Sequence, residues 1–118
     1  MPTESLSLVR DGMKAEHLQL LSECYHRTRV IRDAPRPASW QTWAITEYDE
    51  QIEHGPRYGC GQWFGPRPDH QQKRLRRAIN DLERGGLLTT WKRYGRRLSN
   101  IKLTELGEEI AVSLLRGD

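Results

Sequence analysis

Cationic side chains are concentrated in one part of this 118-residue chain. Residues 66–103 hold 11 Lys or Arg and 3 Asp or Glu, whereas residues 1–65 hold 7 and 9 and residues 104–118 hold 1 and 4. The formal charge is therefore +8 in the middle segment and −2 and −3 in its two flanks. A local positive field attracts polyanions over about 8 Å in physiological salt. Nucleic acid is the leading partner class, and an anionic membrane is its competitor.

The densest group of cations surrounds the pair Tyr94-Gly95, which is typical of a turn. Its members are Lys92, Arg93, Arg96 and Arg97. Their mutual repulsion is offset when a polyanion such as the phosphate backbone of DNA neutralises them and releases its condensed counterions. We therefore predict that these cations, together with Tyr94, contact DNA. The alternative is a charged surface turn that is only solvated.

The segment 69–84, DHQQKRLRRAINDLER, has the pattern of an amphipathic helix. Asp69, followed three residues later by Gln72, predicts a capping box at its start. The apolar face consists of residues at helical spacing, Leu75, Ala78, Ile79 and Leu82. At about 100° per residue the opposite face is polar and mostly cationic, with Lys73, Arg77, Asn80 and Arg84.

Residues near the start of a DNA-binding helix normally reach base edges in the major groove. Gln suits adenine and Arg suits guanine, because each forms two hydrogen bonds with that base. The candidates for base contact are therefore His70, Gln71, Lys73, Arg74 and Arg77. Asn80 and Arg84 lie further along the helix, and we expect them to contact phosphates or solvent. For Gln71 the alternative is a capping or surface role.

Glycines and residue alternation predict the elements that follow. Gly85-Gly86 supplies a left-handed stop to the basic helix. Two short extended runs within residues 87–103 flank the Tyr94-Gly95 turn and predict a β-hairpin, whose register stays open because Leu98 breaks the alternation. Thr104 is then expected to cap a last helix over residues 104–115.

The first half of the chain is less regular. A first helix is predicted over residues 13–32, before a proline-rich segment that cannot continue it. Residues 33–66 form an aromatic-rich insertion, with a second helix at 39–53 for which Ser39 is the expected cap, and then a turn-rich connection. The aromatic residues either fill a small core or form a surface for a ligand or partner. They are Trp40, Trp43, Tyr48, Tyr58, Trp63 and Phe64.

Motifs for catalysis and metal binding are missing from the sequence. There is no GxSxG, P-loop or HExxH pattern, so we expect no enzymatic activity and no cofactor. The pairs His54/Cys60 and Cys24/His26 offer metal-ligand side chains, but neither has a second pair at zinc-like spacing, so no metal site is expected. Two cysteines without a CxxC pattern, as buried or free thiols, fit a reducing compartment. No apolar run is long enough to span a bilayer and the N-terminus lacks a signal-peptide pattern, which predicts a cytoplasmic protein without membrane contact.

The order of the predicted elements resembles a known family. Residues 67–111, above all the helix exit LERGGLL and the segment WKRYGRR, resemble the winged-helix domains of MarR-like and PadR-like transcriptional regulators. The resemblance implies one winged helix-turn-helix domain over residues 1–118, mainly α with a small β-hairpin. In it, residues 69–84 are the recognition helix and residues 87–103 are the wing.

The chain departs from the family upstream of the recognition helix. Residues 33–68 are longer than the short strand and single helix that such domains place there. The helix that precedes the recognition helix is then either residues 40–53 or something short near Tyr58 to Phe64. We take residues 40–53 as that helix.

Two functions from different classes follow from this sequence. The leading hypothesis is a transcriptional regulator that binds double-stranded DNA through the recognition helix and the wing. A homodimer is possible through the first and last helices, because regulators of this type commonly bind two-fold sites. The alternative is an adaptor that binds an acidic protein and not DNA, since winged helices also serve as protein-binding modules and fold does not dictate function.

Overall fold

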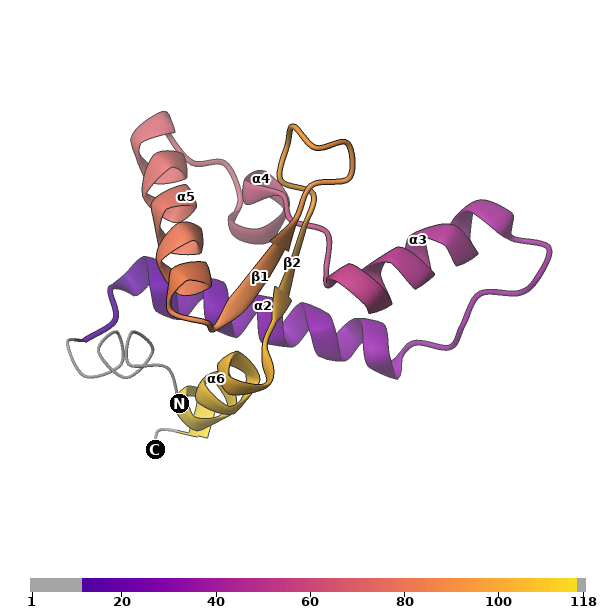
Figure 1. Cartoon of the computed structure of the whole chain (residues 1–118), viewed down its shortest axis with the longest axis horizontal. Helices are drawn as coiled ribbons and strands as arrows, with labels where there is room; N and C mark the ends of the chain where they lie inside the picture. Colours follow the sequence, from indigo (N-terminus) through magenta and orange to yellow (C-terminus); the bar gives the residue numbers. More distant parts are fainter. Residues whose placement is uncertain (1–11, 117–118) are drawn as a thin grey trace.

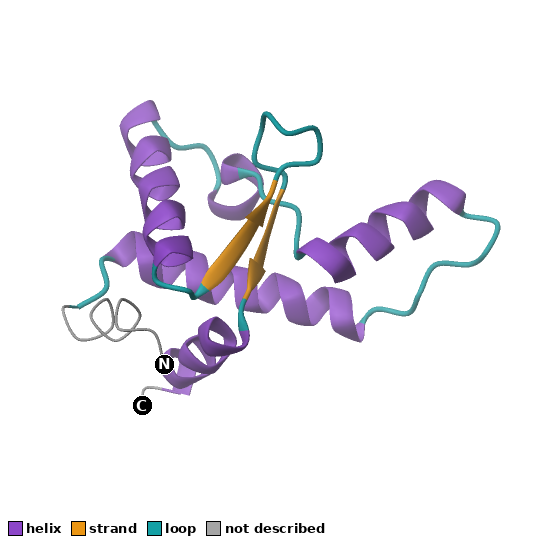
Figure 2. Cartoon of the chain, in the orientation of Figure 1, coloured by secondary structure: helices purple, strands orange, loops and turns teal. Residues whose placement is uncertain are grey.

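A computed structural model describes residues 12–116, and helices pack around a two-stranded antiparallel sheet in it (Figures 1 and 2). The N-terminal segment, for which the sequence indicates no signal peptide, lies outside the described residues. The mainly α fold with a small β-hairpin is confirmed. The elements, labelled as in Figure 1, are α2 (Ala15–Asp33), α3 (Thr42–His54), α4 (Cys60–Phe64), α5 (Asp69–Arg84), β1 (Leu88–Trp91), β2 (Asn100–Leu103) and α6 (Glu105–Arg116).

Helix α2 is the central support of the fold. It packs against α5, α6 and β2, and its buried face contributes Leu20, Leu21 and Cys24 to the core. The core is completed by the apolar face of α5, by Leu87 and by residues of the two strands. The sheet and α5 therefore lie on a fixed base, because both share one set of buried contacts with α2.

Helix α5 buries the four apolar residues that its periodicity predicts, so its cationic face points outward. The predicted capping box is wrong: Pro68 occupies the cap position, and the first helical residue is Asp69. A carboxylate at that position has begun the helix and does not fold back onto the first-turn N–H groups, although it still faces the positive end of the helix dipole. Gln72 instead donates from Nε2 to the Arg67 carbonyl oxygen at 2.8 Å.

The end of α5 is set by Gly86, as predicted. Gly86 has φ = 78°, a conformation that side chains with a Cβ rarely adopt. The Leu87 N–H donates to the Leu82 carbonyl at 2.9 Å, and the Gly86 N–H donates to the Glu83 carbonyl at 3.0 Å. These two hydrogen bonds form a Schellman motif, which directs the chain straight into β1.

The hairpin pairs Leu88 with Leu103 and Trp91 with Asn100. Its strands are short, and residues 92–99 between them form the hairpin loop. The predicted turn lies inside this loop, where the Gly95 N–H donates to the Lys92 carbonyl at 3.0 Å. Leu98 belongs to the loop and packs half-buried against the core, which explains why it breaks the strand alternation.

A third extended segment lies beside β2. Arg57 forms an antiparallel bridge with Asn100, and the Tyr58 N–H donates to the Ser99 carbonyl at 2.8 Å. The chain then enters α4, whose Trp63 is only 6% exposed and donates from Nε1 to the Arg57 carbonyl at 2.9 Å. The connection predicted as turn-rich therefore contains a β-bridge and a helical turn with a core tryptophan.

Helix α3 differs from the other long helices because it has no buried residue. It begins at Thr42 after Gln41, so the prediction that Ser39 caps it is wrong. Trp40 and Trp43 are each 79% exposed, and they do not fill the core as Trp63 does.

The preference for residues 40–53 as the helix that precedes α5 is not supported. Helix α3 packs against α2 and β2, and Figure 1 shows it on the other side of the hairpin from α5. The helix that leads into α5 is the short helix α4, which lies within the segment Tyr58 to Phe64 that was the alternative to residues 40–53. Among the described residues, no helix is both long enough and apolar enough to cross a bilayer.

Candidate nucleic-acid interface

The outward face of α5 presents the predicted polar residues to solvent. Lys73, Arg77, Asn80 and Arg84 are exposed, and so are His70 and Arg74. Gln71 is half-buried, and its Oε1 accepts a hydrogen bond from Arg67 Nη1 at 3.2 Å. The structure thus brings the cations onto one helix face and gives Gln71 a role in holding the start of the helix.

A groove of about 610 Å³ separates α5 from the hairpin loop, and we call it the loop groove. Its cations are Lys73 and Arg76 from α5 and Arg97 from the loop. The remaining lining residues are Tyr58, Gly59, Cys60, Asp69, Gln72, Ile79 and Leu98. Positive charge from the helix and from the loop therefore meets on one surface.

Arg76 was missing from the residues predicted from the sequence. It lies about 60° from Lys73 around the helix, because three residues advance the helix by about 300°. That angle places Arg76 on the flank of the cationic face and not at the centre of that face, and this flank lines the loop groove. Helical spacing gives this angle, but only the position of the loop shows that the flank faces a second cationic element.

A second cleft, of about 700 Å³, lies on the other flank of α5 beside the start of α2, and we call it the α2 cleft. Its cations are Lys14, Arg74, Arg77 and Arg84. Two carboxylates partly offset them: Glu16 lies 3.9 Å from Arg74, and Asp81 lies 3.7 Å from Arg84. Helix α5 therefore has a basic cleft on each side, and the loop groove has fewer ion pairs than the α2 cleft.

His17 joins α2 to α5 at the base of the α2 cleft. Its Nδ1 accepts a hydrogen bond from the Lys14 backbone N–H at 3.0 Å, so the ring proton lies on Nε2. Nε2 then donates to Asp81 Oδ2 at 3.0 Å. Both ring nitrogens are used by the fold and His17 is buried, so this pair positions helices and does not act as a general base.

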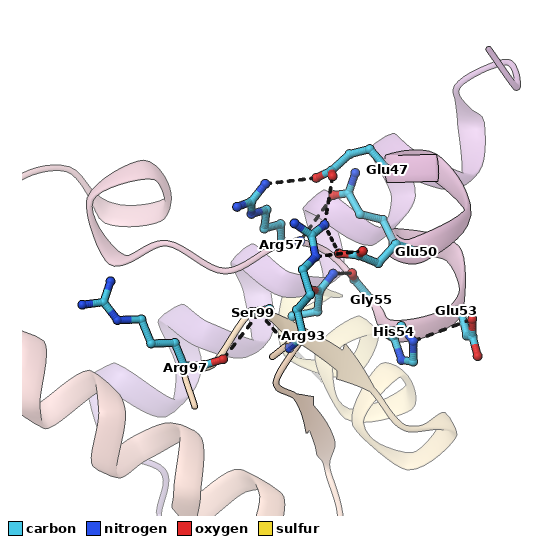
Figure 3. A network of polar contacts seen from close by, with 11 residues as sticks. Glu47, Glu50, Glu53, His54, Gly55, Arg57, Arg93, Arg97 and Ser99 are labelled. Carbon is cyan, nitrogen blue, oxygen red and sulfur yellow. Dashed lines mark hydrogen bonds and ion pairs between the residues drawn. The ribbon is translucent and has the colours of Figure 1, made fainter. Parts of the chain in front are cut away.

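The cations of the hairpin loop point in different directions (Figure 3). Arg93 donates from Nε to Glu50 at 3.0 Å and from Nη2 to Glu47 at 3.2 Å, and Nη2 also contacts the second oxygen of Glu50. The hydrogen bonds with Glu50 raise the pKa of the Arg93 guanidinium above its usual range. Figure 3 shows Arg97 extending the opposite way, away from Glu47 and Glu50.

Arg93, one of the residues predicted to contact DNA, is therefore ion-paired within the chain. Its guanidinium is held by two carboxylates from α3, a helix more than forty residues earlier in the chain. The other predicted loop residues, Lys92, Tyr94, Arg96 and Arg97, are exposed, and within residues 12–116 none of these three cations is paired with a carboxylate.

The two thiols lie in different surroundings. Cys24 is buried in the core, and burial raises the pKa of its thiol to about 12. Cys60 is half-buried and lines the loop groove beside Tyr58, whose own pKa is raised by burial. In the part of the chain that the structure describes, no three His, Cys, Asp or Glu side chains converge as metal ligands do.

The chain matches no protein-family model, no curated protein sequence and no solved structure. What can be inferred about its function therefore rests on the geometry of its side chains. The main feature of that geometry is an exposed cationic helix face that a cationic loop extends across a groove.

Proposed function

We propose that the protein is a winged-helix transcriptional regulator that binds duplex DNA, with α5 in the major groove and the hairpin loop against the phosphate backbone. The observation that carries the proposal is the loop groove. Lys73, Arg76 and Arg97 line it from two elements, and among the described residues none of the three forms an ion pair. Cations without protein partners are available to displace counterions from phosphates.

The order of the elements supports this class of protein. The segment at Arg57 pairs with β2, α4 and α5 follow in turn, and β1 and β2 complete the hairpin before α6. A winged-helix domain requires a short strand, a helix, a recognition helix and a wing in this order, and α3 is then an insertion before the short strand. The major groove of B-DNA, about 12 Å wide, admits one helix such as α5.

The two clefts beside α5 agree with that docking mode. A helix in the major groove has a phosphate backbone on each side. The loop groove and the α2 cleft both present cations, so each fits one strand. Arg77, exposed on the outward face of α5, is the best candidate for a base contact, and Gln71 is a weaker one because its side-chain oxygen is already hydrogen-bonded.

The proposal is tested by titrating random duplexes with the protein at several salt concentrations. Binding should weaken steeply with salt, with a slope of about −0.9 for each phosphate neutralised. Arg97→Ala should reduce the slope by about that amount for every sequence, since it removes one phosphate contact. Arg116→Ala is the matched control, because it removes one exposed cation from the end of α6, outside the residues that line both clefts and the groove between α2 and α6. Absence of binding even at low salt overturns the proposal.

A homodimer and a cytoplasmic location complete the proposal. Residues at the far ends of α2 and α6, including Val30 and Leu115, line a groove of about 630 Å³ that we call the α2–α6 groove. Figure 1 shows α6 below α2 and the hairpin loop above it. Pairing of two copies through this groove would leave both cationic faces available for a two-fold DNA site. DNA binding also agrees with the cytoplasmic location expected from the sequence.

One observation favours the alternative of a protein-binding adaptor. Trp40 and Trp43 are highly exposed at the start of α3, and tryptophan is enriched among residues that dominate binding energy at protein interfaces. The two functions separate in one assay. If the protein fails to bind duplexes at low salt while a purified partner binds it and loses affinity with Trp43→Ala, the adaptor replaces the regulator.

A further inference from the structure

Helix α3 is attached to the hairpin by polar contacts in place of a buried apolar face. Glu47 and Glu50, one turn apart, both point at Arg93 of the hairpin loop (Figure 3). The Arg93 side chain is 24% exposed and that of Glu50 is 13% exposed, so the pair is shielded from solvent more than most surface ion pairs. Charge-assisted hydrogen bonds to both oxygens of one carboxylate also fix the direction of the guanidinium.

The strands of the hairpin and the segment at Arg57 hold the C-terminal end of α3. The His54 ring stacks on the Trp91 ring with centroids 3.7 Å apart and planes 2° apart. Gln51 Oε1 accepts from the Arg57 N–H at 3.3 Å, and Lys102 Nζ donates to the Glu53 carbonyl at 3.1 Å. Helix α3 therefore spans from the strands to the loop, with Glu47 and Glu50 placed at the loop.

Near β2 the hairpin loop is held by Leu98, which packs half-buried against the core, and by the Ser99 carbonyl, which accepts the Tyr58 N–H at 2.8 Å. Inside it, the Arg93 N–H donates to Ser99 Oγ at 3.1 Å, and Ser99 Oγ lies 3.4 Å from the Arg97 carbonyl oxygen. The two contacts of Ser99 Oγ link the two sides of the loop to one another. Arg93 is thus the main polar link from the loop to a helix. Its backbone N–H is also connected, through Ser99 Oγ, to the backbone carbonyl of Arg97.

We propose that α3 is an acidic brace for the hairpin loop, with Glu47 and Glu50 as positioning residues and Arg93 as their attachment point. The inference rests on the proposed DNA binding, because its purpose is to present Arg97 toward α5. Two carboxylates beside Arg93 offset the repulsion among the loop cations before DNA is present. A loop that is already ordered loses less conformational entropy on binding, which strengthens binding without adding a contact.

The first test needs no DNA. Trypsin cleaves after Lys and Arg, and the loop offers four such residues, so cleavage within residues 92–97 reports how often the loop opens. Glu47→Gln with Glu50→Gln should increase that cleavage by about tenfold, because the brace no longer holds Arg93. Asp49→Asn with Glu53→Gln is the matched control: it removes two negative charges from α3 at positions that do not contact the loop. Equal cleavage rates in the two variants overturn the brace.

Arg93→Gln supplies a second variant in the same assay. It removes the attachment point but leaves three cleavable residues in the loop. If the brace acts through Arg93, cleavage of the Arg93→Gln protein should rise to a similar extent, and adding the two Glu→Gln changes should raise it no further. Additive increases would mean that the carboxylates hold the loop by another route, which contradicts the proposal.

The second test measures DNA affinity in the same two double variants. Both lose two negative charges, so the general gain in attraction for DNA is shared and cancels in the comparison. The Glu47/Glu50 variant should bind several-fold more weakly than the Asp49/Glu53 variant, with the same salt slope, because no phosphate contact is lost. Tighter binding with a steeper slope would mean that Arg93 is a phosphate ligand restrained by α3, and it would overturn the brace.

If no form of the protein binds duplex DNA, the proposed function fails, while the cleavage rates still decide whether α3 holds the loop.

Discussion

Cys24 and Cys60 should differ sharply in reactivity. The thiolate is the reactive form, and burial raises the pKa of the Cys24 thiol to about 12. The Cys24 thiol also lies 3.6 Å from the Ile101 carbonyl oxygen, to which it donates a hydrogen bond. Cys60 is half-buried beside an open groove. We expect a thiol reagent to label Cys60 in the native protein and Cys24 only when the protein unfolds.

Mass spectrometry of the labelled peptides, with and without denaturant, checks this expectation. The Cys60→Ser variant is the control, because its native form should stay unlabelled. Labelling of Cys24 in the native protein at the rate seen for Cys60 would contradict the buried position of that thiol.

Gly107 should tolerate no side chain, although it lies inside a helix. A Cβ at this position would lie 1.8 Å from the Leu87 carbonyl oxygen. That oxygen also accepts the Thr104 N–H at 3.1 Å, so Leu87 cannot move without breaking the start of α6. We expect Gly107→Ala to lower the free energy of unfolding by about 3 kcal/mol, measured by urea denaturation.

Gly61→Ala is the matched control for this substitution. Gly61 is also helical, but no atom lies within 4 Å of the Cβ position. Because alanine is the better helix former, Gly61→Ala should leave stability unchanged or raise it by up to about 1 kcal/mol. Equal losses in the two variants would show that the close approach of α6 to Leu87 is not what limits position 107.

The role of each arginine depends on carboxylates that are distant in sequence. Lys73, Arg77 and Arg97 stay exposed, as the sequence predicted, because no acidic element of the described chain reaches them. Arg93 lies in the same cationic run, but Glu50 reaches it from another helix. Helical spacing and charge density report only local neighbours, so they could not separate Arg93 from Arg97.

At the scale of elements, α2 and α6 are joined by a bidentate ion pair whose effect should depend on pH. Arg32 donates from Nη1 and Nη2 to the two oxygens of Glu108, at 2.5 and 3.0 Å. These hydrogen bonds lower the pKa of Glu108 below its usual value of 4.5. The folded state therefore gains stability above about pH 4.5, and this gain is lost as the pH falls through the lowered pKa.

Glu108→Gln should remove that part of the pH dependence. At neutral pH the change should cost less than about 1 kcal/mol, because Arg32 is half exposed and solvent screens the pair. Thermal unfolding from about pH 3 to about pH 7 measures both effects. Glu109→Gln is the control, since the neighbouring carboxylate forms no ion pair within residues 12–116. If both variants show the pH profile of the parent protein, the ion pair does not couple α2 to α6.

The elements that local rules predicted best are those with strong periodicity or glycine signals. The apolar face of α5, its end at Gly86 and the cap of α6 are all confirmed; in the cap, Thr104 Oγ1 accepts the Gly107 N–H at 3.0 Å. The insertion was harder. Its glycines and prolines predicted turns where α4 lies. Helix α4 is a short helix with one buried tryptophan, Trp63, and it has too few residues to show a helical period in the sequence.

The position of α3 could not be predicted for a different reason. Its aromatic residues suggested core packing, yet the helix is held by ion pairs, by a stacked histidine and by backbone contacts. Such contacts leave no apolar stripe in the sequence. The loop groove could not be predicted from the sequence either, because it exists only where the loop and α5 converge in three dimensions.

At the scale of the whole molecule, the hairpin loop and α6 lie on opposite sides of α2 (Figure 1). The described chain is elongated, with extents of 49 × 31 × 24 Å. The hairpin loop and the start of α5 lie above α2 in Figure 1, whereas α6 lies below it. An arrangement of this kind allows DNA on one side and a second protein copy on the other without competition.

The α2–α6 groove should hold two copies of the chain together. Val30 is 56% exposed and Leu115 is 57% exposed, and both line the α2–α6 groove. Because burying such side chains between two copies stabilises association, we expect sedimentation to find a dimer at about ten micromolar. A dimer of this kind should protect two DNA half-sites about 34–36 Å apart.

Val30→Glu with Leu115→Glu should give a monomer that protects a single half-site, because it would bury two charges at the contact. Trp40→Glu with Trp43→Glu introduces the same charge at the exposed start of α3 and should leave the dimer intact. A parent protein that sediments as a monomer, or a dimer broken only by the tryptophan changes, would show that the two copies do not meet at the α2–α6 groove.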